Sequence, residues 1–286
     1  MVEFINALAD PDNAFLRIAI YVATLSSISF GVIGTYVVTR RISYLAGAIS
    51  HCVFGGIGAG MYIQKKVGIA WFEPMYGAVI SAIIAAVIIG LVSLYARQRE
   101  DTVIGALWAI GMALGLIFVD ITPGYFDITS YLFGDILLLS MKDLWMVVFL
   151  DILVVAVSLY FYNTLLAVCF DHEFAGLRGV HSGAFYILLL CLTSLTIVLL
   201  VRVVGIVMVI ALLTLPAAAA GQFARRLWQM MLLAITFCVF ITWTGLAVSY
   251  SLKLSSGPTI IIIAGVAYII TIFLLKLRQK ITFKRD

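Results

Sequence analysis

Apolar runs of about 20 residues recur along the whole chain, and each is long enough to cross a bilayer as an α-helix. The composition agrees with this pattern. Of the 286 residues, 64% are hydrophobic and only 11% are charged, whereas a soluble domain is about half apolar and a quarter charged. A transmembrane β-barrel is excluded, because barrel strands alternate polar and apolar residues and these runs are continuous. The sequence therefore predicts an all-α, polytopic membrane bundle in which residues 1–286 form a single transmembrane domain.

Eight or nine transmembrane helices are predicted. The nine segments are residues 14–39, 44–64, 72–96, 102–120, 143–168, 183–201, 204–222, 227–250 and 258–276. The division is least certain at "VRVVGIV", where two segments share one apolar run. Arg178 and Arg225 are both expected on the cytoplasmic side, so an even number of crossings must separate them. We therefore expect two helices there, with Arg202 and Gly205 at their outer turn.

The basic residues predict the orientation, because cytoplasmic loops carry an excess of Lys and Arg. An N-out, C-in arrangement puts twelve basic residues inside and six outside. The inner set is Arg40, Arg41, Arg97, Arg99, Arg178, Arg225, Arg226, Lys276, Arg278, Lys280, Lys284 and Arg285. The outer set is Arg17, Lys65, Lys66, Lys142, Arg202 and Lys253. These basic residues flank the predicted spans. The net charge of +4 therefore agrees with a chain surrounded by a lipid bilayer, and we expect no nucleic-acid partner.

Several other features are excluded. The N-terminal "MVEFINALADPDNAF" has no basic residue before its short apolar core, so it does not resemble a signal peptide. The cysteines are scattered, which supports neither a disulfide framework nor a zinc knuckle. They are Cys52, Cys169, Cys191 and Cys238. No nucleophile–base pair, HExxH, Walker A or GxGxxG motif occurs. The chain is therefore not predicted to be an enzyme, and an ATP-driven process would need another subunit.

The longest polar stretch expected on the cytoplasmic side is "CFDHEFAGLRGVHSG", residues 169–183. Asp171 is a plausible N-cap, and Gly179 is a plausible stop for a short helix. Between them, Phe174, Ala175 and Leu177 give an amphipathic helix that lies at the membrane surface. This segment is either a plain connector or a docking element for a cytoplasmic partner.

Few ionisable residues occur at membrane depth, where burying a charge is costly and usually functional. They are His51, Asp151, and at the outer margin Glu73, Asp120, Asp127 and Asp135. His51 lies about 10 Å into the membrane, counted from Tyr44 at 1.5 Å per residue. Neutral imidazole is the commonest ligand for divalent metals. His51 is therefore either a metal ligand or a histidine that hydrogen-bonds to a neighbouring helix.

Small residues predict close helix packing. Gly56 and Gly60 form a small-xxx-small face that would fix His51 near the interior of the bundle. In "LLTLPAAAAGQFARRLW", Pro216 is expected to kink a span, and the alanines beside it allow a close approach of another backbone. We assign no chemistry to this second stretch.

Six stretches, in this order and spacing, resemble the permease subunits of the ABC importers for zinc, manganese and iron. They are "RRISYLAGAISHCVFGGIG", "REDTVIGALWAIGMALGLIF", "TPGYFDITSYLFGDIL", "FDHEFAGLRGV", "VVGIVMVIALLTLPAAAA" and "VSYSLKLSSGPTIIIIAG". The resemblance runs from about residue 15 to residue 276. It implies a homodimeric permease in the bacterial cytoplasmic (inner) membrane, two ABC ATPase subunits below it, and an extracytoplasmic metal-binding protein above it.

The resemblance also implies roles for individual residues. The segment 170–180 would be the coupling helix that fits a groove of the ATPase, through Asp171, His172, Glu173, Phe174, Ala175, Leu177 and Gly179. His51 matches the histidine that the family places on the metal path. The cargo would be zinc or manganese, with iron a further possibility. No cofactor would be bound permanently, and ATP would bind to the partner subunit.

The sequence departs from the family at one position. Many members have an aspartate four residues before the histidine, and this chain has Gly47 there. Residues at this spacing share a helix face, so a carboxylate ligand is missing. Asp135 or Asp120 could replace it. A site poorer in oxygen donors favours zinc over manganese.

Two other functions remain open at this stage. A permease for vitamin B12 or ferric chelates has a related architecture, but it needs no histidine in its path. An ion-coupled secondary carrier needs no ATPase, but it would need paired intramembrane charges and broken helices in two repeats. Asp151 alone gives the carrier little support.

Overall fold

The computed structural model describes residues 8, 13–95, 100–124, 132–134, 141–179 and 181–282. Helices account for all the regular structure of these residues, which confirms the predicted all-α class. The α-helices are α2 (Ala14–Thr39), α3 (Ser43–Tyr62), α4 (Pro74–Tyr95), α5 (Glu100–Ile121), α7 (Met141–Tyr160), α8 (Tyr162–Phe170), α9 (His172–Leu177), α10 (Ser182–Val204), α11 (Ile206–Gly221), α12 (Leu227–Leu252) and α13 (Ser256–Thr282). A π-helical turn, η1 (Ile63–Val67), extends α3.

Six of these helices are long and apolar enough to cross a membrane: α2, α3 with its π-helical extension, α4, α5, α12 and α13. The pair α7 and α8 passes the same test together, although the two are bent by 74°. Shorter apolar helices lie at Ser182–Val198 and Ile206–Gly221. The chain is therefore a membrane protein with several crossings.

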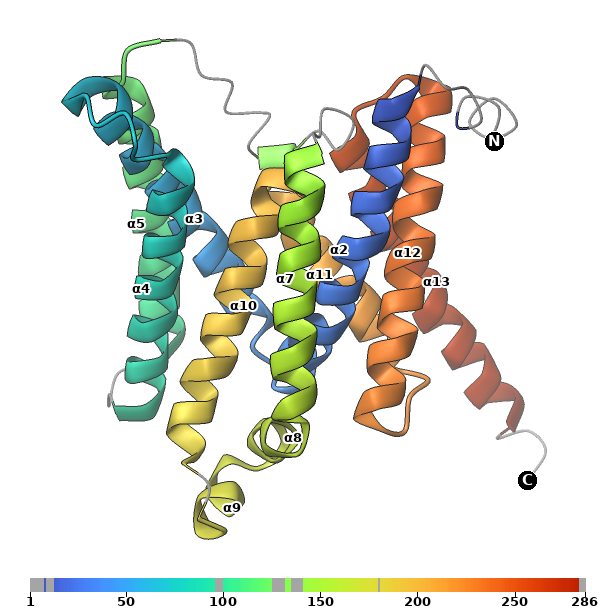
Figure 1. The fold of residues 1–286 in the computed structure, drawn as a ribbon. Coiled ribbons are helices and arrows are strands. Elements are labelled where there is room, and N and C mark those ends of the chain that lie inside the picture. Colours follow the sequence, from blue (N-terminus) through green and yellow to red (C-terminus); the bar gives the residue numbers. More distant parts are fainter. Residues whose placement is uncertain are drawn as a thin grey trace.

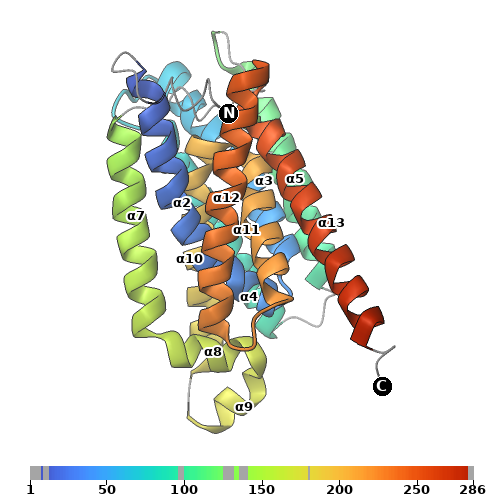
Figure 2. The ribbon, with the colours of Figure 1, turned by 90° about the vertical axis from the view of Figure 1, so that its right-hand side faces the viewer.

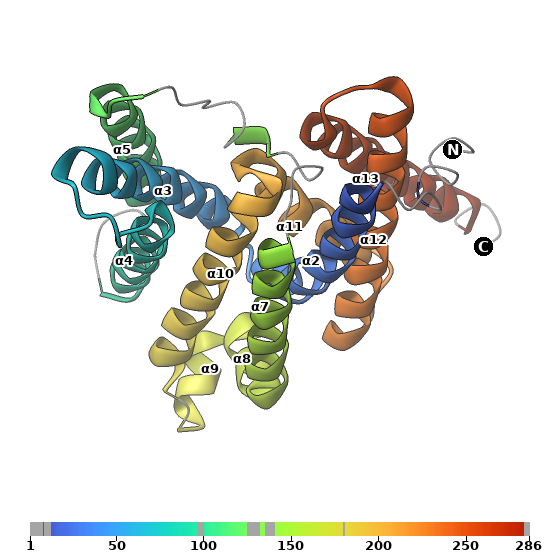
Figure 3. The same ribbon diagram turned by 45° about the horizontal axis from the view of Figure 1, so that its top comes forward.

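The helices form two groups joined by α10 (Figures 1 and 3). On one side, α3 packs between α4 and α5, and on the other, α2 packs against α7, α11 and α12. Helix α10 contacts α4 and α3 of the first group as well as α2, α7 and α11 of the second. The start of α2 and the end of α13 lie at opposite ends of the bundle (Figure 2).

The segment 143–168, predicted as one span, is divided into two helices by a break at Phe161. Helix α7 ends at Tyr160, and α8 turns away by 74°. Leu165, Val168 and Cys169 on α8 are buried. The buried face of α8 therefore packs against α2 and α10. The apolar sequence does not reveal this bend, because both halves are equally hydrophobic.

The turn expected near Gly205 separates α10 from α11. Gly205 has φ +83°, a left-handed conformation that favours glycine. A Cβ at Gly205 would collide with the backbone of Gly134, and one at Gly257 would collide with the carbonyl of Phe133. Three glycines thus let the segment 132–134 lie directly against the α10–α11 turn and the start of α13. Farther along, α11 continues through Pro216, which is buried, to Gly221.

Candidate functional site

His51 lies half-buried on α3 and faces α5. Its Nδ1 is 3.3 Å from the Sδ of Met112. Its ring stacks on Trp108, with 4.9 Å between the ring centroids and an angle of 27° between the planes. An imidazole, a thioether and an indole therefore meet at one place between two helices.

Trp108 also covers Gly47, one helical turn before His51. A Cβ at Gly47 would lie 2.5 Å from Cζ3 of Trp108, closer than real Cβ contacts come. Gly47 and His51 are four residues apart on α3, and Trp108 and Met112 are four residues apart on α5, so each pair shares one helix face. We call these four residues the His51 cluster.

Glycines hold α3 tightly against both of its neighbours. A Cβ at Gly55 would lie 2.8 Å from the carbonyl oxygen of Gly111 on α5, and one at Gly58 would lie 2.8 Å from that of Gly115. On the other side, a Cβ at Gly56 would collide with the Gly77 carbonyl of α4, and one at Gly60 would lie 2.8 Å from Cα of Pro74. This spacing places backbone directly on backbone on both sides of α3.

Gly56→Leu is expected to destabilise the protein strongly. A branched side chain at this position meets the backbone of α4, and overpacking of a tight interior costs about 1–3 kcal/mol or more. The measurement is the yield of monodisperse protein in detergent and its midpoint of thermal unfolding. Gly105→Leu is the matched control on α5, because the space around Gly105 is open. An unchanged midpoint for Gly56→Leu would show that the close packing there does not matter for stability.

The other predicted metal-path residues do not join the His51 cluster. Asp120 is exposed near the end of α5, about 12 Å along the helix axis from Met112 at 1.5 Å per residue. Asp135 and Asp127 lie outside the described residues. Cys52 donates a hydrogen bond to the Leu107 carbonyl, 3.4 Å away. Within the described part of the chain, no group of three or more His, Cys, Asp and Glu side chains could hold a metal ion.

Asp151 is 5% exposed in the middle of α7. Its Oδ1 accepts a hydrogen bond from the Ser29 hydroxyl of α2. Its Oδ2 has no hydrogen-bond partner among the described residues. This contact links α2 to the helix that leads into α8 and α9. It contains no second acidic or basic side chain, so it gives no support to an ion-coupled carrier.

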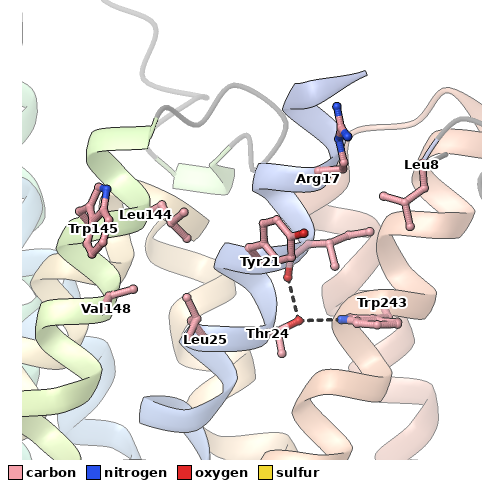
Figure 4. A pocket seen from close by; sticks show the side chains of 10 residues that line it. Leu8, Arg17, Tyr21, Thr24, Leu25, Leu144, Trp145, Val148 and Trp243 are labelled. Carbon is pink, nitrogen blue, oxygen red and sulfur yellow. Dashed lines mark hydrogen bonds between the residues drawn. The ribbon is translucent and has the colours of Figure 1, made fainter. Parts of the chain in front are cut away.

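A cavity of about 580 Å³ lies between α2, α7 and α12 (Figure 4). It is lined mainly by apolar and aromatic side chains, among them Tyr21, Trp145 and Trp243. Trp243 Nε1 donates a 2.9 Å hydrogen bond to Thr24 Oγ1 at its wall. The described lining contains no His, Cys, Asp, Glu or Met, so this cavity is not a metal site.

The short helix expected in the segment 170–180 is α9, which begins directly after Asp171. It forms the end of the molecule opposite to the start of α2 (Figures 1 and 2). It contacts α8 and α10. Ala175 is buried, whereas Leu177 is 87% exposed. Gly179 beyond it has φ +79°. The side chains of His172, Glu173 and Phe174 lie outside the described part of the structure.

Sequence reasoning missed Trp108 and Met112. Both stand in "REDTVIGALWAIGMALGLIF", a stretch used for the family resemblance but not searched for ligands. Their spacing of four residues matches that of Gly47 and His51, and this is the one signal that could have pointed to them. The contact between the helices themselves depends on tertiary packing, which the sequence pattern does not contain.

Comparisons with known proteins agree with the resemblance. Residues 12–275 match the ABC 3 transport family. A probable metal transport system membrane protein of Chlamydia pneumoniae is 36% identical over 85% of this chain and 83% of its own. The manganese transport system membrane protein MntC of Listeria innocua is 32% identical over 95% of this chain and 94% of its own.

A solved structure has the same fold. PsaBC from Streptococcus pneumoniae, in complex with a Fab, has a TM-score of 0.82 and 28% identity, and the match covers 94% of each chain. The relatives are transport components and not enzymes, in agreement with the absence of catalytic motifs. The family match spans nearly the whole chain, and we conclude that this protein is a member of the ABC 3 transport family, a metal-importer permease subunit.

Proposed function

We propose that the chain is the membrane-spanning subunit of an ATP-driven importer for divalent metal ions. The observation that carries this proposal is the His51 cluster, which puts a half-buried imidazole between tightly packed helices of a metal-transport family. The cargo is zinc or manganese, with iron as a third candidate. The Listeria innocua relative is named for manganese.

The proposed topology has nine crossings, with the N-terminus outside and the C-terminus inside the bacterial cytoplasmic membrane. The six long helices, the bent pair α7–α8 and the two shorter helices α10 and α11 supply the crossings. The excess of basic residues supports a cytoplasmic position for α9. The break at Gly205 between α10 and α11 then lies at the outer side, as the sequence predicts.

The proposed mechanism needs a second copy of the chain. A bare divalent ion is very costly to place in lipid, so two copies would line a polar path between them. An ATPase subunit would dock on α9 of each copy, and an extracytoplasmic metal-binding protein would deliver the ion. When ATP closes the ATPase dimer, the two α9 helices would move together and switch the open side of the path. The path must bind the ion weakly enough to release it.

Reconstitution tests the function directly. Proteoliposomes that contain the permease, its ATPase and metal-loaded binding protein should accumulate metal when ATP is supplied. Permease alone should carry none, because the chain has no nucleotide-binding motif. The measurement is metal content by mass spectrometry, with and without ATP. Uptake by permease alone down a proton gradient would contradict the proposal and favour a secondary carrier.

A further inference from the structure

Nδ1 of His51 and Sδ of Met112 are placed to bind one ion together. The two atoms are 3.3 Å apart. A zinc–nitrogen bond of about 2.0 Å and a zinc–sulfur bond no shorter than the thiolate length of about 2.3 Å hold their donor atoms about 3.5 Å or slightly more apart at a tetrahedral angle. The pair can therefore chelate an ion with almost no movement. In the empty state the same distance suits a hydrogen bond from Nδ1–H to the thioether, which keeps both groups in position.

Gly47 and Trp108 leave no carboxylate oxygen one helical turn before His51. Position 47 is the one on α3 that faces the same way one turn before His51, and Trp108 fills the space that any side chain there would need. Its indole also covers one face of the His51 ring. Asp120 stands too far along α5 to reach His51. Among the described residues, the side-chain donors at this level are thus one nitrogen and one sulfur.

This donor set discriminates between metals. Imidazole and thioether suit zinc and softer ions, whereas manganese prefers carboxylate, carbonyl and water oxygens. We infer that the His51–Met112 pair is a zinc-selecting site in the path, and that Gly47 and Trp108 together leave it without the oxygen donor that manganese prefers. The inference rests on the proposed function and narrows its cargo from two metals to zinc. A site with two protein donors in each copy also binds weakly enough to pass the ion on.

The test measures metal binding by the full permease–ATPase complex in nanodiscs, without the binding protein. This design removes any selectivity that the binding protein imposes. Equilibrium dialysis gives the affinities for Zn²⁺ and for Mn²⁺. Most sites prefer zinc to manganese, so the informative quantity is how the ratio of the two affinities changes between variants.

Met112→Leu should lower zinc affinity about tenfold or more, since even outer-shell partners of metal sites are worth 10–100-fold, and should leave manganese affinity unchanged. It should also remove the sulfur neighbour of zinc in the X-ray absorption spectrum at the zinc edge. Met208→Leu is the matched control, because Met208 is a buried methionine on α11. Wild-type affinity and an unchanged spectrum for Met112→Leu would overturn the inference.

A second set of variants introduces a carboxylate at position 47. Gly47→Asp alone should displace the Trp108 ring, because its Cβ would lie 2.5 Å from Cζ3 of that ring. Gly47→Asp combined with Trp108→Ala removes that collision and should raise manganese affinity about tenfold, while Trp108→Ala alone should not. An unchanged manganese affinity in an assembled double variant would overturn the claim that the missing oxygen donor at position 47 disfavours manganese. If the double variant does not assemble, the Met112→Leu comparison decides the question.

ATP-driven uptake by the same preparations separates this inference from the proposed function. If the wild-type complex transports metal and Met112→Leu binds zinc normally, the zinc site is wrong and the importer stands. If the wild-type complex transports no metal, the proposed function itself fails. Wild-type protein that binds manganese as tightly as zinc would contradict the inference in either case.

Discussion

Leu177→Asp is expected to release the ATPase from the permease and to abolish ATP-driven metal uptake. Leu177 is 87% exposed on α9, at the end of the molecule that we place in the cytoplasm. An exposed aliphatic side chain on a short projecting helix suits a pocket of a partner. A carboxylate in such a pocket is buried without a partner, and loss of a central anchor typically costs about 2 kcal/mol or more. This corresponds to more than tenfold weaker binding at 1.4 kcal/mol per factor of ten.

Co-purification of the two subunits and titration of the ATPase onto permease in nanodiscs measure this effect. Leu254→Asp is the matched control, because Leu254 is also an exposed leucine, 54% accessible, in the connection between α12 and α13. That variant should retain the ATPase. Normal binding of the ATPase by Leu177→Asp would show that α9 is only a connector.

A milder change in the same helix should separate docking from coupling. Glu173→Ala with Phe174→Lys is expected to leave a folded complex that hydrolyses ATP but transports little metal. The ratio of metal carried to ATP consumed measures this uncoupling. Because α9 is held by both α8 and α10, a force on it can reach α7 through the bend at Phe161. The hydrogen bond between Asp151 and Ser29 joins α7 to α2 on the same route.

Hydrophobic patterning was sufficient to predict most of the fold. Helix α2 has the predicted bounds, and both ends of α4 and of α12 lie within two residues of the predicted ends. The reason is physical: a bilayer requires continuous apolar helices, so length and hydropathy nearly determine where they lie. The turn at Gly205 was also predictable, because basic residues limit the number of crossings. The break at Phe161 was not, since it depends on where α8 finds apolar surface to bury.

The candidate site was only half predictable. His51 is conspicuous because an ionisable ring in an apolar run needs an explanation. Gly47 is conspicuous only against the family pattern. Trp108 and Met112 lie some sixty residues away and become meaningful only when α5 packs on α3. Gly47 leaves a space on α3, and Trp108 of α5 fills it. This fit arises from the contact between the two helices, so neither segment reveals it alone.

His51→Ala is expected to abolish or strongly reduce metal uptake while the complex still assembles and hydrolyses ATP at its basal rate. The imidazole is the nitrogen donor of the His51 cluster, and it costs less to bury than a carboxylate while it binds metal without a fixed charge. Removing it leaves only the thioether of Met112, a weak ligand by itself. Assembly should survive, because the backbone contacts of Gly55 and Gly58 with α5 do not involve the ring.

The sharpest control for this variant is Cys52→Ala. Cys52 is the next residue on α3, carries a possible metal donor and is also half-buried, but its thiol donates to the Leu107 carbonyl. Uptake by Cys52→Ala should therefore equal that of the wild type. Both variants are assayed in proteoliposomes with metal-loaded binding protein, beside basal ATP hydrolysis. If His51→Ala transported metal as well as Cys52→Ala does, the ring would serve packing through Trp108 and Met112, and the ion would have to cross elsewhere.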